Sequence, residues 1–244
     1  MRRSFWILAL VCAVAVAGCG GGSGPTGPTP RVPRLSRTRF LAFGDSFTAG
    51  EVTSPIGAAP TLVHKSVLVP AASYPSVLQA QLQSAYTSQS SAIAVINSGQ
   101  PGERILDGLA RFPSAFAASG AEVVLIMEGA NGLPGVGPDI STGVMRIMVQ
   151  AAKEGRARVF VGSMIPQVAS RPRGNTPAFE LVGYNTILQI MCTQEGVTYV
   201  DLYNAMLPNA DTLIGSDGLH PTEAGYRRIA ELFFAALKST LEEP

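Results

Sequence analysis

Charged residues are scarce in this sequence, and they are unevenly placed. Only 14% of the 244 residues are Asp, Glu, Lys or Arg, and the formal net charge is +1. All 17 acidic residues follow residue 40, so that residues 40–244 carry 12 basic against 17 acidic side chains, a net charge of −5. Proteins that follow a phosphate backbone need clustered basic side chains. We therefore expect no nucleic acid partner.

Cysteine and histidine, the usual soft ligands of metals, are almost missing. The cysteines are Cys12, Cys19 and Cys192, and the first two lie inside or at the edge of an N-terminal apolar run, which leaves no disulfide framework. Two histidines and one remaining cysteine are too few for a zinc site, which needs several converging ligands. We expect neither a metal nor an organic cofactor. Cys192 lies in a helical stretch beside apolar residues, which favours a place in the core.

The first residues are typical of an export signal. A short cationic start, MRR, precedes an apolar run over 5–17 that is shorter than the roughly 20 residues needed to cross a bilayer. This pattern predicts a signal peptide over residues 1–18. The run ends in VAGC, which resembles the lipobox of bacterial lipoproteins and implies that Cys19 becomes a lipidated N-terminus. The alternative is an ordinary secretory signal cut near Ala17.

Either signal predicts export, and the lipobox implies a lipid anchor in the bacterial cell envelope, on its periplasmic or extracellular face. Residues 19–38 are rich in glycine and proline and have few apolar side chains to bury, so we expect a flexible tether between the membrane and a domain over 39–244. Trp6, the single tryptophan, would leave with the signal. Its loss removes the best sugar-stacking side chain from the mature chain.

Short apolar runs alternate with stretches of helical period along the rest of the chain. The runs cover residues 39–43, 92–97, 122–127, 157–162 and 197–202, and the helical stretches cover 74–86, 103–119, 143–154, 179–195 and 222–242. Continuously apolar strands are what a parallel sheet covered on both faces requires. The pattern predicts an α/β fold, a three-layer α/β/α sandwich with its ligand site outside the carboxyl ends of the strands.

The segment 51–72 shows no clear periodicity. Long segments of this kind are often functional. We leave open whether it lines an acyl pocket, acts as a lid or is a packed connection.

The turn after the first predicted strand holds a serine, Ser46. A serine there is often only a helix cap, and it needs a base to become a nucleophile. His64 has no carboxylate near it in sequence, whereas His220 follows Asp217 by three residues in DGLHP. A tight turn would let Asp217 accept the Nδ1 proton and leave Nε2 free as a base. The alternative for DGLHP is a purely structural role, as the start of a helix with a proline in its first turn.

A serine nucleophile also needs donors for the oxyanion of its tetrahedral intermediate. The loop NSGQPGE over 97–103 offers a backbone N–H at Gly99 or Gly102, and the turn GANG offers the side-chain amide of Asn131. Each is weak evidence alone, because glycine and asparagine are common in turns for conformational reasons.

Together these segments resemble the GDSL/SGNH hydrolase family. The most specific matches are GDSFTAG at 44–50 and DGLHPTEAGY at 217–226, and the resemblance extends from residue 40 to about 226. It implies a flavodoxin-like sheet of about five parallel strands. It also implies that Ser46 is the nucleophile, His220 the general base and then acid, and Asp217 its orienting partner.

The resemblance further implies an oxyanion hole made by the backbone N–H groups of Ser46 and Gly102 and the side chain of Asn131. Gly102 is preferred to Gly99 because the family's glycine usually lies just before a helix. One departure is Gly132, where the family commonly has an aspartate.

The expected activity is hydrolysis of an ester through an acyl-enzyme on Ser46, in the manner of a carboxylesterase or lipase. The substrate would be a small-molecule, lipid or glycan ester. Two alternatives remain at this point: a carbohydrate O-acetylesterase of the same family, and a non-catalytic binding domain anchored in the envelope. No G-x-S-x-G elbow occurs, so the α/β-hydrolase nucleophile motif is missing.

Overall fold

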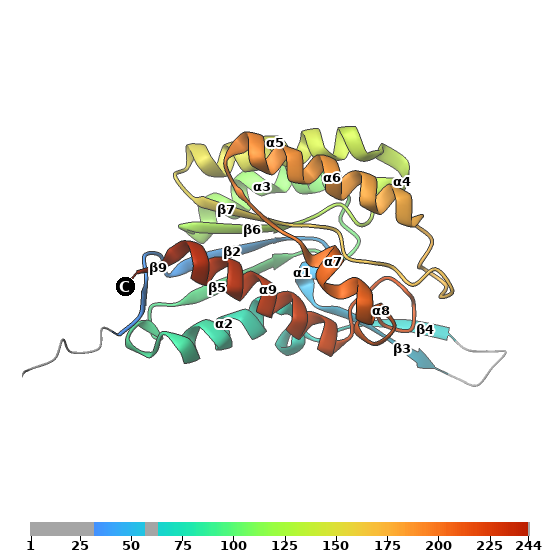
Figure 1. Ribbon diagram of the computed structural model, residues 1–244, viewed down its shortest axis with the longest axis horizontal. Helices are drawn as coiled ribbons and strands as arrows, with labels where there is room; N and C mark the ends of the chain where they lie inside the picture. The colour runs from blue at the N-terminus through green and yellow to red at the C-terminus, as the bar shows by residue number, and fades with distance from the viewer. Residues whose placement is uncertain (1–31, 57–62, 244) are drawn as a thin grey trace, which may run out of the picture. The chain divides into compact units, whose positions relative to one another are not determined.

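A five-stranded parallel sheet forms the centre of the computed structural model, which describes residues 32–56 and 63–243 (Figure 1). Its strands are β2 (Arg39–Gly44), β5 (Ala94–Gly99), β6 (Val123–Met127), β7 (Arg158–Gly162) and β8 (Thr198–Val200). They lie in the order β5-β2-β6-β7-β8, and each neighbouring pair is parallel. This order is that of a flavodoxin-like sheet, as the resemblance to the GDSL/SGNH family implied.

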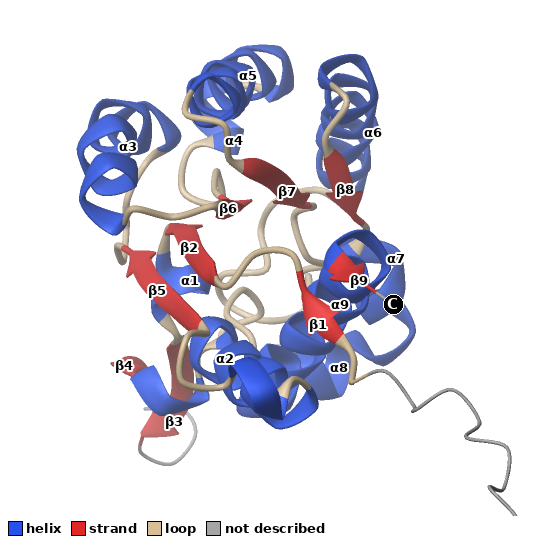
Figure 2. Ribbon diagram, turned by 90° about the vertical axis from the view of Figure 1, so that its left-hand side faces the viewer, coloured by secondary structure: helices blue, strands red, loops and turns tan. Residues whose placement is uncertain are grey.

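Helices cover both faces of the sheet, which confirms the three-layer α/β/α prediction (Figures 1 and 2). One face carries α3 (Ile105–Ser119), α5 (Pro138–Glu154) and α6 (Ala178–Glu195), and the other carries α2 (Tyr74–Ala85) and α9 (Glu223–Leu241). The middle strand β6 is buried at every residue. Its unbroken apolar sequence, VVLIM, follows from this double cover, because no face of the strand meets water.

Helix α5 begins five residues before the stretch expected at 143–154. Pro138 stands at its start, where the missing N–H costs nothing and the fixed φ suits a helix. Gly137 precedes it with φ of 83°, a conformation that favours glycine.

Several short helices were not predicted. They are α1 (Ser46–Ala49), α4 (Leu133–Val136), α7 (Leu202–Met206) and α8 (Ala210–Leu213), with 3₁₀ turns at Pro70–Ala72, Thr87–Gln89 and Leu207–Asn209. Helices of four or five residues are too short to show a period in the sequence.

The segment 51–72, expected to be irregular, is mostly a β-hairpin. Strands β3 (Glu51–Ile56) and β4 (Val63–Leu68) pair antiparallel beside the carboxyl ends of the main strands (Figure 1). The hydroxyl of Tyr226 in α9 donates to the Glu51 carbonyl at 2.7 Å and fixes the start of the hairpin.

Residues 34–38, expected to belong to the tether, pack onto the domain. Strand β1 (Arg34–Leu35) pairs with β9 (Glu242–Glu243) near the C-terminus, and Leu35 is buried in the core. The side chain of Gln89 bonds both backbone groups of Leu35. The expected signal peptide (1–18), Cys19 and the tether up to residue 31 lie outside the described residues, so these interpretations stay predictions. None of the helices within 32–56 and 63–243 is long and apolar enough to cross a membrane.

The carboxyl ends of β2 and β6 mark the point where the order of the sheet reverses. The chain runs from β2 outward to β5 and then returns across β2 to β6. Loops that leave two neighbouring strands in opposite directions create a crevice for ligands. Ser46 follows β2 and Asn131 follows β6, so both predicted site residues lie at this point.

Candidate active site

Ser46 lies at the first position of the one-turn helix α1, directly after β2. The carboxylate of Asp45 accepts a hydrogen bond from the Phe47 N–H at 2.9 Å and caps this turn. Gly44 brings the strand within close reach of β6, because a Cβ there would lie 1.9 Å from the Met127 carbonyl oxygen. These constraints hold the Ser46 side chain at the strand end, and it is 3% exposed.

The turn ahead of α9 holds His220 and Asp217 in one compact unit. Oδ1 of Asp217 accepts hydrogen bonds from the backbone N–H groups of Leu219 and His220, both at 3.0 Å. Gly218 has a φ of 86°, which lets the chain fold back between the carboxylate and the imidazole. The ring of Phe47 packs edge-on against the imidazole with centroids 5.8 Å apart.

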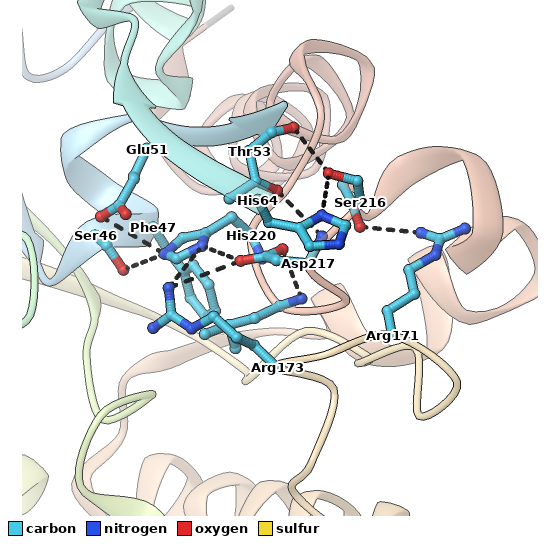
Figure 3. A network of polar contacts seen from close by, with 12 residues as sticks. Ser46, Phe47, Glu51, Thr53, His64, Arg171, Arg173, Ser216, Asp217 and His220 are labelled. Atoms are coloured by element: carbon cyan, nitrogen blue, oxygen red, sulfur yellow. Dashed lines mark hydrogen bonds and ion pairs between the residues drawn. The ribbon is translucent and has the colours of Figure 1, made fainter. Parts of the chain in front are cut away.

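The serine, the histidine and the aspartate form a continuous hydrogen-bonded path (Figure 3). Ser46 Oγ lies 3.0 Å from His220 Nε2, and His220 Nδ1 lies 2.7 Å from Asp217 Oδ2. Burial raises the pKa of Asp217, but the hydrogen bonds from His220 and the two backbone groups outweigh it and hold that pKa below its usual range. An ionised Asp217 accepts a hydrogen bond from His220 Nδ1–H, and this tautomer leaves Nε2 free to accept the Ser46 hydroxyl proton.

The predicted oxyanion donors lie in two adjoining turns. Asn131 Nδ2 donates to the Glu103 carbonyl at 3.1 Å, which places this side chain beside Gly102. Gly102 is exposed with φ of 76°, and a Cβ there would meet nothing within 4 Å. Gly99 instead allows β5 to pack closely against α1, because a Cβ there would lie 2.1 Å from the Ala49 nitrogen. Gly102 is therefore the glycine that borders open space next to Asn131.

A cluster of buried acids lies beneath these turns. Glu103 is bonded through Oε1 to Arg111 Nε at 2.7 Å, and Asp45 Oδ2 accepts from the Ala130 N–H at 3.0 Å. Burial raises the pKa of Asp45 to about 6. Burial and the nearby carboxylates of Asp45 and Glu103 raise the pKa of Glu128 well above its usual range. The cluster ties the serine turn to the oxyanion turn.

Comparison with known proteins gives the site a family context. Residues 42–228 match the model of the GDSL-like lipase/acylhydrolase family. The chain belongs to this family. No curated protein sequence matches it.

Solved structures with the same fold include two named enzymes. A lipase/acylhydrolase from Enterococcus faecalis is 22% identical, covers 84% of this chain and 97% of its own, and superposes with a TM-score of 0.67. An acetylxylan esterase from Geobacillus stearothermophilus is 22% identical, covers 83% of this chain and 94% of its own, and superposes with a TM-score of 0.62. At this identity both show the GDSL/SGNH fold alone.

Two charged side chains beside the imidazole were missed by the sequence analysis. Glu51 Oε2 lies 3.6 Å from His220 Nε2, and Arg173 Nη1 lies 3.5 Å from His220 Nδ1 (Figure 3). Glu51 follows the family's glycine-ended GDSFTAG motif directly, and that adjacency is a signal that could have found it. Arg173 lies in the loop between β7 and α6, which has no periodicity and no motif.

The other candidate residues lie elsewhere. His64 in β4 lies 3.0 Å, through Nδ1, from Ser216 Oγ, on the far side of the Asp217 turn from Ser46. Cys192 is buried in the core, as predicted, and burial raises the pKa of its thiol to about 12. Within the described part of the chain, no group of three His, Cys, Asp or Glu side chains could hold a metal ion.

Proposed function

We propose that this GDSL-family hydrolase cleaves carboxylic esters through an acyl-enzyme on Ser46. The proposal is supported most by the path of two short hydrogen bonds from Ser46 Oγ through His220 to Asp217. A serine hydroxyl is a poor nucleophile until a base takes its proton, and an ordered imidazole with an ionised carboxylate behind it supplies that base.

In the acylation step, Ser46 Oγ attacks the carbonyl carbon of the ester while its proton moves to His220 Nε2. The carbonyl oxygen becomes an oxyanion, which accepts hydrogen bonds from the N–H groups of Ser46 and Gly102 and from the Asn131 amide. The C–O bond to the alcohol then breaks, and the leaving oxygen takes the proton from Nε2. Asp217 stabilises the transient imidazolium through Nδ1.

Deacylation repeats these steps with water in place of serine. Water loses a proton to Nε2 and attacks the acyl carbon, and the ester bond to Ser46 breaks. Ser46 Oγ recovers its proton from Nε2, and the carboxylic acid leaves. No cofactor enters this sequence of steps.

Turnover of 4-nitrophenyl acetate by the wild-type protein and a Ser46→Ala variant tests the proposal. We expect kcat to fall by about three to six orders of magnitude, because the triad acts as a unit. Ser239→Ala, an exposed serine in α9, is the matched control and retains activity. Equal turnover by the wild type and Ser46→Ala would contradict the nucleophile assignment. Turnover by neither would favour the non-catalytic binding domain.

A carbohydrate O-acetylesterase is the second candidate, and a cavity favours it. A polar cavity of about 240 Å³ adjoins Asn131 and Leu219. This is below the roughly 300–1,000 Å³ of pockets that enclose drug-sized ligands, so it suits a short or polar group. Rates on acyl chains of two to twelve carbons, compared with acetate release from acetylated xylan, separate the candidates. A preference for long chains would dismiss the deacetylase.

Export and lipidation at Cys19 belong to the same proposal and rest on the sequence alone. A fatty-acid label should attach to the wild-type chain in a bacterial host and be lost in Cys19→Ser. Labelling of neither chain would leave the ordinary secretory signal as the better interpretation, and labelling of both would place the lipid on a residue other than Cys19.

A further inference from the structure

Arg173 has a side chain that the proposed ester hydrolysis does not use. Its guanidinium carries five N–H donors, yet its polar neighbours within the described residues are His220 Nδ1 at 3.5 Å, which itself donates to Asp217, and Asp217 Oδ2 at 3.7 Å. Both distances exceed the 2.7–2.9 Å typical of a charge-assisted hydrogen bond. The ion pair between Arg173 and Asp217 is thus long, and the guanidinium keeps N–H donors that have no close acceptor among the described residues.

Arg171, two residues earlier in the same loop, shows the contrast. Its guanidinium donates to the carbonyl oxygens of Ile214 at 2.6 Å and Asp211 at 2.9 Å. That arginine fastens the loop to the Asp217 turn. Arg173 makes no comparable bonds among the described residues, and its side chain is 46% exposed. Its charge is therefore available to a ligand.

The backbone holds Arg173 in place. Its N–H donates to the Asp217 carbonyl at 2.6 Å, and the Val168 N–H donates to the Gly218 carbonyl at 2.9 Å. Gln167 and Thr176 close the loop with two reciprocal hydrogen bonds, at 3.0 and 3.1 Å. The loop that carries Arg173 is thus already ordered, so a ligand need not order this backbone when it binds, which lowers the cost of binding.

Arg173 also lines the cavity of about 240 Å³ next to the site. Its other polar neighbours there are Asn131, Gln167, Asn175 and Thr176. A guanidinium with amides and a hydroxyl around it offers the donor geometry that a carboxylate accepts. Because Asn131 also belongs to the proposed oxyanion hole, a substituent of an ester bound at Ser46 could extend into this cavity.

The positive charge of Arg173 opposes protonation of His220, and a bound carboxylate would offset this effect. His220 must become an imidazolium during catalysis, and a cation 3.5 Å from Nδ1 opposes this step. A bound anion offsets that charge. On the other nitrogen, Glu51 Oε2 lies 3.6 Å from Nε2 with a side chain that is 13% exposed, and it repels anions. An anionic group on the substrate is therefore expected to bind near Arg173, on the Nδ1 side of the imidazole, and not near Glu51.

We propose that Arg173 and the cavity it lines form a subsite for a carboxylate on the substrate, so that the physiological ester is anionic in its acyl or its alcohol half. This inference rests on the proposed ester hydrolysis at Ser46. It narrows the substrate class from any short ester to one that carries a negative charge a few bonds from the carbonyl.

Two pairs of esters test it, each an anionic ester and its neutral methyl ester. The first pair carries the charge in the acyl half: 4-nitrophenyl hydrogen glutarate and 4-nitrophenyl methyl glutarate. The second carries it in the alcohol half: 4-acetoxybenzoate and methyl 4-acetoxybenzoate. The readout is the ratio of kcat/KM between the anionic and the neutral member, with non-enzymatic hydrolysis subtracted. The pair that shows the preference identifies the half that enters the cavity.

We expect the wild type to prefer the anionic member of one pair, mainly through KM. Arg173→Gln should lower this ratio by about tenfold to a hundredfold, the range of a charge-assisted hydrogen bond. Arg173→Lys should restore part of it. Arg228→Gln, which removes an exposed charge that is paired with Glu231 on α9, should leave the ratio unchanged. Equal thermal unfolding temperatures of the variants exclude a folding defect.

A ratio that is the same in the wild type and Arg173→Gln for both pairs, with turnover retained, overturns the anionic subsite and leaves the esterase intact. Absence of turnover on all four esters is a different result. It removes the proposed ester hydrolysis, and the subsite with it.

Discussion

Asp217 and Glu128 are both buried carboxylates beside the carboxyl edge of the sheet, yet their protonation is driven in opposite directions. Asp217 accepts hydrogen bonds from His220 Nδ1 and from two backbone N–H groups, and its pKa is lowered. Glu128 accepts one, from the Gly129 N–H, its Oε2 has no partner among the described residues, and its pKa is raised. Burial raises the pKa of both groups; the donors around Asp217 outweigh it, whereas the neighbouring carboxylates of Asp45 and Glu103 add to it at Glu128.

Asp45 stands between these two extremes. It accepts from two backbone groups, Phe47 and Ala130, and its pKa is raised to about 6. The surroundings of Asp217 favour its charged form, those of Asp45 and Glu128 favour the protonated form to different degrees, and Glu103 is paired with Arg111.

Replacing the ionised carboxylate should have the largest effect. In Asp217→Asn the side-chain amide can donate to His220 Nδ1, and the imidazole proton then lies on Nε2. A protonated Nε2 cannot accept the proton of Ser46. We expect kcat for 4-nitrophenyl acetate to fall by about 10³–10⁴-fold. Asp107→Asn, an exposed aspartate in α3, is the control and keeps its activity. A loss below tenfold in a folded Asp217→Asn protein would show that the aspartate does not orient the base.

The buried glutamates Glu103 and Glu128 should respond differently to replacement by glutamine. Glu103 is ion-paired with Arg111, whereas Glu128 forms no ion pair among the described residues. Glu103→Gln leaves Arg111 without its carboxylate, and we expect the free energy of unfolding to fall by about 2–4 kcal/mol. Glu128→Gln replaces a carboxyl whose pKa is raised by an uncharged amide of the same shape, and should not lower the free energy of unfolding by more than about 1 kcal/mol. Urea unfolding at pH 7 measures both.

The pH dependence of these variants sharpens the contrast. Because the folded pKa of Glu128 is raised, the native state binds its proton more tightly than the unfolded chain, and this stabilisation is lost as pH rises from about 4 through the raised pKa. Relative to the wild type, Glu128→Gln should therefore gain stability with rising pH. If Glu128→Gln instead lost stability relative to the wild type from pH 4 to pH 8, the folded protein would lower the pKa of Glu128 and not raise it.

The strands of the main sheet and the long helices could be predicted from the sequence, because their buried residues follow the regular spacing of a strand or a helix. The five apolar runs and five helical stretches correspond to the strands of the main sheet and to α2, α3, α5, α6 and α9, with boundaries that differ by a few residues. The hairpin β3–β4 was missed because neither of its strands is continuously apolar. Its prolines and polar residues are typical of loops.

In the candidate site, residues carried by motifs could be named from the sequence, and residues placed by tertiary contacts could not. Ser46, Asp217 and His220 come together as their spacing and motifs predicted. Arg173 reaches the imidazole only because the loop after β7 is bonded to the Asp217 turn, a contact between segments over 40 residues apart. No local pattern records such a contact.

The central claim is that Ser46 is an activated nucleophile. The most direct test is to identify the residue that a fluorophosphonate probe modifies. The probe should phosphonylate the folded wild-type protein, and mass spectrometry should find the modification on the peptide that contains Ser46. His220→Ala should abolish the labelling, since the serine then has no base. Modification of a different residue, or no modification of the folded protein, would contradict the account.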